Sequence, residues 1–175
     1  MKRGEAHYRN YLWGSLCDFS RSAAVRWMFD SANVIKDTLN SSRVFETNNN
    51  VEYGISWARH TSGFIRSQAN FIDATIWVYL PEKFKGKVSW IASLETNSGT
   101  ISTNESTISS ETIPVGQWTP LSVSIFLPEI KNIPFDSEVK VRLNTKNSSA
   151  FFVRQAYVGV RTGNPAIYWI TYGLF

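Results

Sequence analysis

The most regular pattern in the chain is the alternation of aliphatic residues with polar or aromatic residues over residues 71–80. The side chains on one side of this segment are those of Ala74, Ile76, Val78 and Leu80. The side chains on the other side are those of Asp73, Thr75, Trp77 and Tyr79. A period of two residues is typical of a half-buried β-strand, and Pro81 ends it. We therefore expect a strand with one face in the core and one face turned outward.

Alternation over residues 122–127 and 139–144, together with short, aromatic or apolar segments elsewhere, predicts further strands. These are residues 44–46, 52–57, 88–94, 122–127, 139–144, 150–160 and 166–175. Two segments stay open: residues 8–28 fit a helical face or a first strand, and residues 96–112 fit a polar loop or an edge strand around 101–108. About eight to ten short strands without a long helix predict an all-β protein, an antiparallel β-sandwich.

The alternating strands also predict the core of the sandwich. Besides the four aliphatic residues of 71–80, its members are Leu121, Val123, Ile125, Val139, Val141 and Leu143. Burial of one such side chain stabilises the fold by about 1.5–3 kcal/mol, which is enough to dictate the strand register. The reverse faces of the strands are then free for function.

Composition and charge narrow the class of protein. Hydrophobic residues make up 43% of the 175 residues and aromatic residues 14%, which excludes a disordered chain. The single cysteine, Cys17, excludes an intramolecular disulfide and a multi-cysteine metal site. No apolar run reaches the ~18 residues of a membrane span. We therefore expect no membrane insertion. Because the net charge of +4 is scattered, we also expect no nucleic-acid partner.

The sequence shows no recognisable catalytic set. Its two histidines, His7 and His60, stand alone, and neither a Gly-x-Ser-x-Gly turn nor a His-Glu-x-x-His zinc motif is present. A glycosidase needs two placed carboxylates, and no pair among the 14 acidic residues stands out. We therefore predict that the protein is not an enzyme, and that it has no cofactor and no catalytic metal.

Aromatic residues on the reverse strand faces are the main candidates for ligand binding. Sugar rings present flat C–H faces to indole and phenol rings, and aromatic stacking is worth roughly 0.5–1.5 kcal/mol beyond area burial. Trp77 and Tyr79 share a strand face with Asp73, so stacking and hydrogen-bonding groups lie side by side. We predict a ligand site that consists of these three residues, Arg142 and Tyr157.

Other interpretations of these residues stay open. Aromatic residues of the N-terminal segment, Trp13, Phe19 and Trp27, are an alternative cover for the Trp77 face. Trp118, between Gly116 and Pro120, is expected to be a structural corner residue. The arginines Arg142, Arg154 and Arg161 fit either forks for the carboxylates of an acidic polysaccharide or ordinary charges on exposed strands.

Three segments carry a resemblance to a known family. Residues 73–81 (DATIWVYLP) are similar to a strand that ends in W-V-x-x-P, residues 116–121 (GQWTPL) to a G-x-W-x-x-L strand, and residues 150–160 (AFFVRQAYVGV) to a closing strand. In this order they resemble carbohydrate-binding modules with a jelly-roll, galactose-binding-like fold, as in families four and twenty-two. The resemblance implies a jelly roll over residues 44–175, with residues 1–43 as an N-terminal segment and first strand that pack on it.

The resemblance also bears on metal binding and on the parent protein. Arg154 and Gln155 stand where the family has an acidic pair, so the family's structural calcium ion is not indicated. Residues 12–20 and 24–27 resemble the start of such modules in phage tail fibres and tailspikes, which are generally trimers. The apolar residues Tyr168, Trp169, Tyr172 and Phe175 are then expected to form a subunit contact, and the alternative is an ordinary last strand.

The function that these observations predict is glycan recognition without catalysis. We expect a domain of a phage tail fibre or tailspike in the virion, which binds host surface polysaccharide, forms the trimer, or does both. Three alternatives stay open: an accessory carbohydrate-binding module of a secreted polysaccharide-degrading enzyme, a structural trimerisation or capping domain without a ligand, and a small polysaccharide lyase.

Overall fold

The computed structural model describes residues 10–20, 26–36, 42–65, 71–130 and 132–162. Within these ranges the strands are β1 (Asn10–Cys17), β2 (Trp27–Phe29), β3 (Val34–Lys36), β4 (Arg43–Glu46), β5 (Tyr53–His60), β6 (Phe71–Tyr79), β7 (Val88–Thr96), β8 (Gly99–Ile108), β9 (Trp118–Phe126), β10 (Glu138–Asn144) and β11 (Phe152–Thr162). Short 3-10 helices follow three of them: η2 (Ser31–Asn33), η3 (Thr61–Gly63) and η4 (Leu127–Glu129). No helix in these ranges is long and apolar enough to cross a membrane.

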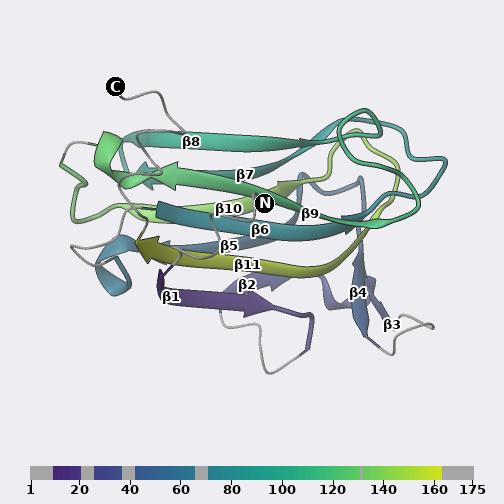
Figure 1. Cartoon of the computed structure of the whole chain (residues 1–175), viewed down its shortest axis with the longest axis horizontal. Helices are drawn as coiled ribbons and strands as arrows, with labels where there is room; N and C mark the ends of the chain where they lie inside the picture. The colour runs from purple at the N-terminus through teal and green to yellow at the C-terminus, as the bar shows by residue number, and fades with distance from the viewer. Residues whose placement is uncertain (1–9, 21–25, 37–41, 66–70, 131, 163–175) are drawn as a thin grey trace.

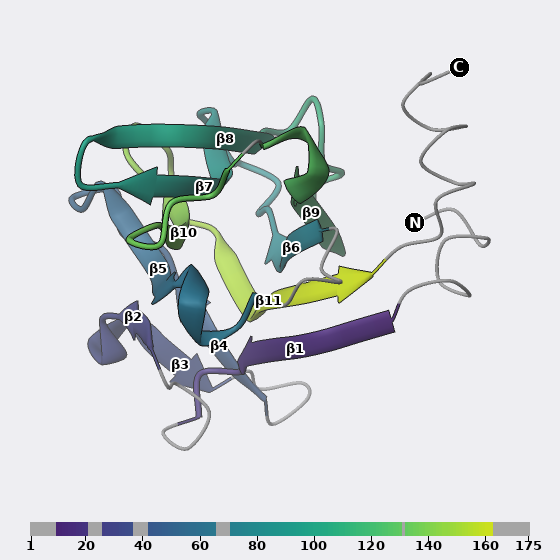
Figure 2. The same cartoon turned by 90° about the vertical axis from the view of Figure 1, so that its left-hand side faces the viewer.

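The strands form two antiparallel sheets that stack face to face (Figure 1). Sheet A has the order β3-β4-β11-β6-β9, and β1 pairs with β11 along a later part of that strand than β4 does. Sheet B has the order β2-β5-β10-β7-β8. Figure 2 shows the two layers, with β8, β7, β10 and β5 on the left and β6, β11 and β1 on the right. The predicted all-β sandwich is confirmed.

The predicted core residues lie between the two sheets. All of them are buried except Leu121, which is half-buried and packs against the core. Trp57 and Trp90 of sheet B are also fully buried there. The indole N–H of Trp90 donates a hydrogen bond of 3.1 Å to the carbonyl oxygen of Ala74 in sheet A. A buried indole N–H needs such a partner, and here the partner links the two layers.

The N-terminal segment belongs to both sheets. Its strands β1 and β2 pair with β11 and β5, respectively, so the described part of residues 8–28 is extended rather than helical. Trp13 packs on Trp57 with ring centroids 5.7 Å apart, and Phe19 stacks on Phe45 at the same distance. Trp27 is buried as well. These aromatic residues enlarge the core, and the alternative that they cover the face of Trp77 is wrong.

The polar segment 96–112 contains an edge strand, β8, and not only a loop. Two of its side chains reach across to the backbone of β9 in the other sheet. The Asn104 amide donates to the carbonyl oxygen of Ser124 at 2.7 Å, and the Ser106 hydroxyl donates to that of Ser122 at 2.8 Å. These bonds explain why a strand with few apolar residues is held at the edge of the sandwich.

The C-terminal prediction concerns residues beyond the described ranges. Tyr168, Trp169, Tyr172 and Phe175, together with the expected strand over residues 166–175, all lie outside them. The predicted subunit contact and the trimer therefore stay predictions from the sequence.

Candidate functional site

The outer face of sheet A carries half-buried aromatic side chains from three neighbouring strands. The antiparallel register places Trp118 of β9 and Phe152 of β11 on either side of Tyr79 of β6. The ring centroids of Tyr79 lie 5.6 Å from those of Trp118 and 6.2 Å from those of Phe152. Trp77 of β6 and Tyr157 of β11 project from the same side. We call these five residues the aromatic face.

Arg154 lies across the aromatic face because of an irregularity in β11. The pairing register with β6 shifts between Val153 and Gln155, so Arg154 is the extra residue at this point. Its guanidinium carbon lies 4.4 Å from the ring centroid of Trp77 and 5.2 Å from that of Trp118. Both contacts are within the range of cation–π attraction. The side chain thus spans the face from β11 over β6 to β9.

Tyr157 lies flat on the sheet because its neighbours are glycines. A Cβ atom at Gly14 of β1 would come within 2.3 Å of the Tyr157 hydroxyl oxygen, and one at Gly159 would come within 2.5 Å. Real Cβ atoms do not approach so closely, so any other residue would push the ring away. The two glycines therefore leave room for the Tyr157 ring to lie close to the sheet, next to Leu16 and Gln155.

Asp73 shares the outer side of β6 with Trp77 and Tyr79, but its carboxylate serves the fold. The residue is only 3% exposed and forms a buried ion pair with Arg161 of β11. It also accepts a 2.6 Å hydrogen bond from the hydroxyl of Ser124 on β9. The Arg161 guanidinium in turn lies 3.9 Å from the ring centroid of Phe71. Asp73 therefore links β9, β6 and β11 and is not open to a ligand.

The prediction that Arg142 lies with the other site residues is wrong, because β10 belongs to sheet B whereas β6 and β11 belong to sheet A. It projects from β10 on the outer face of sheet B, on the opposite side of the sandwich. Its guanidinium contacts the carboxylate of Glu95 at 3.0 Å and lies 5.5 Å from the ring centroid of Tyr53. The alternation in the sequence correctly predicted that Arg142 lies on an outer face. It could not predict the sheet, because the place of β10 depends on pairing with strands that are distant in the sequence.

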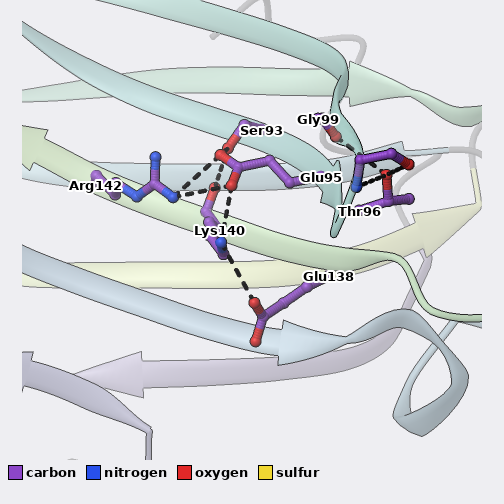
Figure 3. A network of polar contacts seen from close by, with 8 residues as sticks. Ser93, Glu95, Thr96, Gly99, Glu138, Lys140 and Arg142 are labelled. Carbon is purple, nitrogen blue, oxygen red and sulfur yellow. Dashed lines mark hydrogen bonds and ion pairs between the residues drawn. The ribbon is translucent and has the colours of Figure 1, made fainter.

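Figure 3 shows that Arg142 is part of an ionic network on sheet B. The Lys140 ammonium lies 2.8 Å from Glu95 and 3.6 Å from Glu138, and the Ser93 hydroxyl donates to Glu95 at 2.7 Å. Burial raises the pKa of Glu95, but the hydrogen bonds from Lys140, Ser93 and Arg142 outweigh it and lower the pKa to about 2. This outer face is thus charged and internally neutralised, in contrast to the aromatic face.

An open depression of about 720 Å³ borders the aromatic face where β11 meets β1 and β4. Its lining includes Leu16, Asp18, Ser20, Ser42, Arg43, Arg154 and Gln155. Hydrogen bonds from Ser20 lower the pKa of Asp18, and the charge of Arg43 lowers it further. Because Arg154 takes part in both, the depression and the aromatic face form one continuous surface.

The described part of this surface holds no cluster of potential metal ligands. In the described ranges, no three or more His, Cys, Asp or Glu residues come together in a way that could hold a metal ion. Cys17 is fully buried, and burial raises the pKa of its thiol to about 11, so the thiol stays protonated and shielded. His60 is exposed at the end of β5, and His7 lies outside the described residues.

Sequence reasoning found only part of the aromatic face. It identified Trp77, Tyr79 and Tyr157 but assigned Trp118 to a structural corner. Counting back in twos from the outward residue Ser122 would have placed Trp118 on the outer face, so the signal was present. The position of Arg154 had no such signal, because the register shift in β11 interrupts the alternation.

Comparison with known proteins identifies the fold. No protein-family model matches the chain, and no curated protein matches it in sequence. Among solved structures, it is similar to the CBM22-1 xylan-binding domain of Paenibacillus barcinonensis Xyn10C (TM-score 0.51, 10% identity, 90% of this chain and 98% of that chain). It is also similar to TmCBM27, a module with specific mannan recognition (TM-score 0.50, 12% identity, 89% and 99%).

A third similar structure is a larger enzyme, the arabinose-bound α-L-arabinofuranosidase MgGH51 (TM-score 0.51, 14% identity). The match covers 85% of this chain but only 27% of the arabinofuranosidase, so the similarity concerns one part of that protein. At these identities the comparisons establish the fold alone. The chain therefore has the jelly-roll β-sandwich fold that is found in carbohydrate-binding modules.

Proposed function

We propose that the chain is a non-catalytic module that binds a polysaccharide on the aromatic face of sheet A. The observation that carries this proposal is the cluster of half-buried rings from β6, β9 and β11 on one outer face. Rings in this setting offer stacking surface to the C–H faces of sugars, and the groups around them supply hydrogen bonds. The depression beside the cluster extends the surface along which a chain of sugar units lies.

The fold comparisons support this proposal by analogy. Two structures that match most of the chain are named for xylan binding and mannan recognition. Because one fold hosts many functions, this analogy raises the expectation of a glycan ligand, and the site itself has to carry the argument. The same comparisons favour an accessory module of a polysaccharide-degrading enzyme as the parent protein.

The alternative parent is a phage tail fibre or tailspike in the virion, which the N-terminal segment resembles. The two differ in oligomeric state, since the fibre domain needs a trimer for avidity. Light scattering on the 19.9 kDa chain separates them. We expect the mass of one chain for the accessory module, and a mass three times as large would favour the fibre and make the C-terminal aromatic residues its contact.

Binding to the aromatic face is tested by removal of one ring. We expect the Trp118→Ala variant to lose about tenfold in affinity for a polysaccharide that the wild type retains, equivalent to ~1.4 kcal/mol. The matched control is Tyr53→Ala, which removes an exposed ring beside an arginine on the outer face of sheet B. Affinity electrophoresis in gels with neutral and acidic polysaccharides measures how strongly the wild type and the two variants are retarded.

Two results would contradict the proposal. The first is that the wild-type protein is not retarded by any polysaccharide in the panel. The second is that Tyr53→Ala weakens retention as much as Trp118→Ala does, because the aromatic face would then have no special role. Melting temperatures of both variants show whether a loss of affinity reflects a loss of fold.

A further inference from the structure

We propose that the polysaccharide is acidic and that Arg154 binds its carboxylate groups. This inference rests on the proposed function and names the class of ligand for the same face. It follows from the ion-pair partners of the arginines on the outer strand faces, from the contacts of Arg154 with two indole rings, and from the charges around the adjoining depression.

The three arginines that the sequence singles out differ in their partners. Arg142 contacts Glu95, and Arg161 forms a buried ion pair with Asp73, so both charges are neutralised within the protein. Arg154 forms no ion pair within the described residues. It lies over indole rings, which attract the cation but do not neutralise it. Of the three, Arg154 alone retains its charge for an outside anion.

The stacking of Arg154 also prepares it for a carboxylate. A guanidinium group that lies on an aromatic ring keeps the N–H groups at its edges free, and these match the two oxygens of a carboxylate. Contacts with Trp77 and Trp118 on two strands hold the group in place at the aromatic face. The side chain therefore loses little rotamer freedom when an anion binds, which lowers the entropic cost of binding.

The same contact disfavours a neutral sugar. Because the Arg154 guanidinium lies over the ring of Trp77 at 4.4 Å, a sugar that stacks on that side has to displace it. An acidic sugar does not have to displace the guanidinium, since it binds the group where it lies. The neighbouring sugar units of the same polymer then stack on Tyr79 and Phe152. Specificity is a difference between two affinities, and this arrangement lowers the affinity for a neutral sugar while it raises the affinity for an acidic one.

The depression continues the positive surface beyond Arg154. Arg43 is exposed on its rim, and its guanidinium donates to the carbonyl oxygen of Phe19 at 3.3 Å. The one carboxylate in the described lining is that of Asp18, which accepts hydrogen bonds from Ser20 and lies in the field of Arg43. Within the described lining of the depression, Arg43 and Arg154 thus outnumber the single carboxylate, which favours a polymer with repeated carboxylates there.

The experiment compares acidic polymers with their neutral counterparts. Polygalacturonate, alginate and hyaluronan are tested at about 0.15 M salt beside carboxyl-reduced samples of the same polymers, by affinity electrophoresis and calorimetry. We expect the wild type to bind at least one acidic polymer about tenfold or more tightly than its reduced form. We expect Arg154→Gln to abolish this preference. The matched control Arg142→Gln removes one charge that also lies beside a ring, and we expect it to keep the preference.

Each outcome decides between the proposals. Equal binding of acidic and reduced polymers, or binding of neutral polymers alone, overturns the acidic ligand and leaves the aromatic face as a glycan site. Failure to bind any polymer overturns both. A preference that falls equally in Arg154→Gln and Arg142→Gln indicates general surface charge and also overturns the role of Arg154. If Arg154→Gln does not fold, Arg154→Lys decides, because it keeps the charge but loses the fork: an unchanged preference overturns the bidentate contact.

Discussion

Arg142 and Arg154 each lie beside an aromatic ring on an outer strand face, yet their surroundings give them different roles. Glu95 holds Arg142 in an ionic network, whereas Arg154 lies on two indole rings. An ion pair that is closed within the protein contributes to stability, and an unneutralised cation on an aromatic surface is available to a ligand. The difference depends on the carboxylate of Glu95 next to Arg142 in sheet B.

Glu95 should make the stability of the protein depend on pH. Its folded pKa of about 2 lies below the ordinary value of 4.5, so its network stabilises the fold above pH 4.5 and loses this contribution as the pH falls towards 2. We expect the free energy of unfolding of the wild type to fall by about 1–2 kcal/mol more over this range than that of Glu95→Gln. Urea unfolding at a series of pH values measures this difference.

The control for Glu95 is Glu105→Gln, which removes an exposed carboxylate from β8 in the same sheet. Its unfolding should follow the wild-type pH dependence. Parallel curves for the wild type and Glu95→Gln would show that the network does not stabilise the folded state.

The strand with strict alternation was predicted together with its inward and outward faces, whereas β2 and β3 were not recognised as separate strands. Over residues 71–80 the aliphatic side chains bury and the aromatic ones project, as a period of two requires. The strands β2 and β3 have only three residues each, too few for a period to be recognised. The strand β8 is polar on both sides because its inward side chains bond to the backbone of β9 rather than to the core.

Long-range pairing explains the remaining differences at the site. The sequence gives the outward residues of a strand but not its neighbours, so it could not place Arg142 on sheet B or Trp118 beside Tyr79. The same limit applies to Asp73, whose outward position was expected but whose pairing with Arg161 was not. Each of these depends on a partner strand far away in the chain.

The hydrogen bonds from β8 to β9 should stabilise the edge of the sandwich. We expect the double variant Asn104→Ala/Ser106→Ala to lower the free energy of unfolding by about 1–3 kcal/mol, since it removes two bonds worth ~0.5–1.5 kcal/mol each. Urea denaturation measures the loss. The control Thr103→Ala/Glu105→Ala changes the outward side of the same strand, and a loss of equal size there would indicate a strand-propensity effect instead.

The sandwich as a whole has two outer faces of different chemistry. The face of sheet B is charged and internally neutralised, whereas that of sheet A joins aromatic rings to a cation and a depression. Between them lies a core with the indoles of Trp27, Trp57 and Trp90. A ligand that binds as proposed therefore contacts one side of the molecule only.

The seven tryptophans report where a ligand binds. Each indole N–H gives its own signal in a ¹⁵N-correlated NMR spectrum, and assignment by single Trp→Phe variants identifies each one. When the polysaccharide or an oligosaccharide from it is added, we expect saturable shifts of Trp77 and Trp118, while the core signals of Trp27, Trp57 and Trp90 stay in place. Saturable binding that leaves Trp77 and Trp118 unshifted would contradict the assignment of the site to the aromatic face.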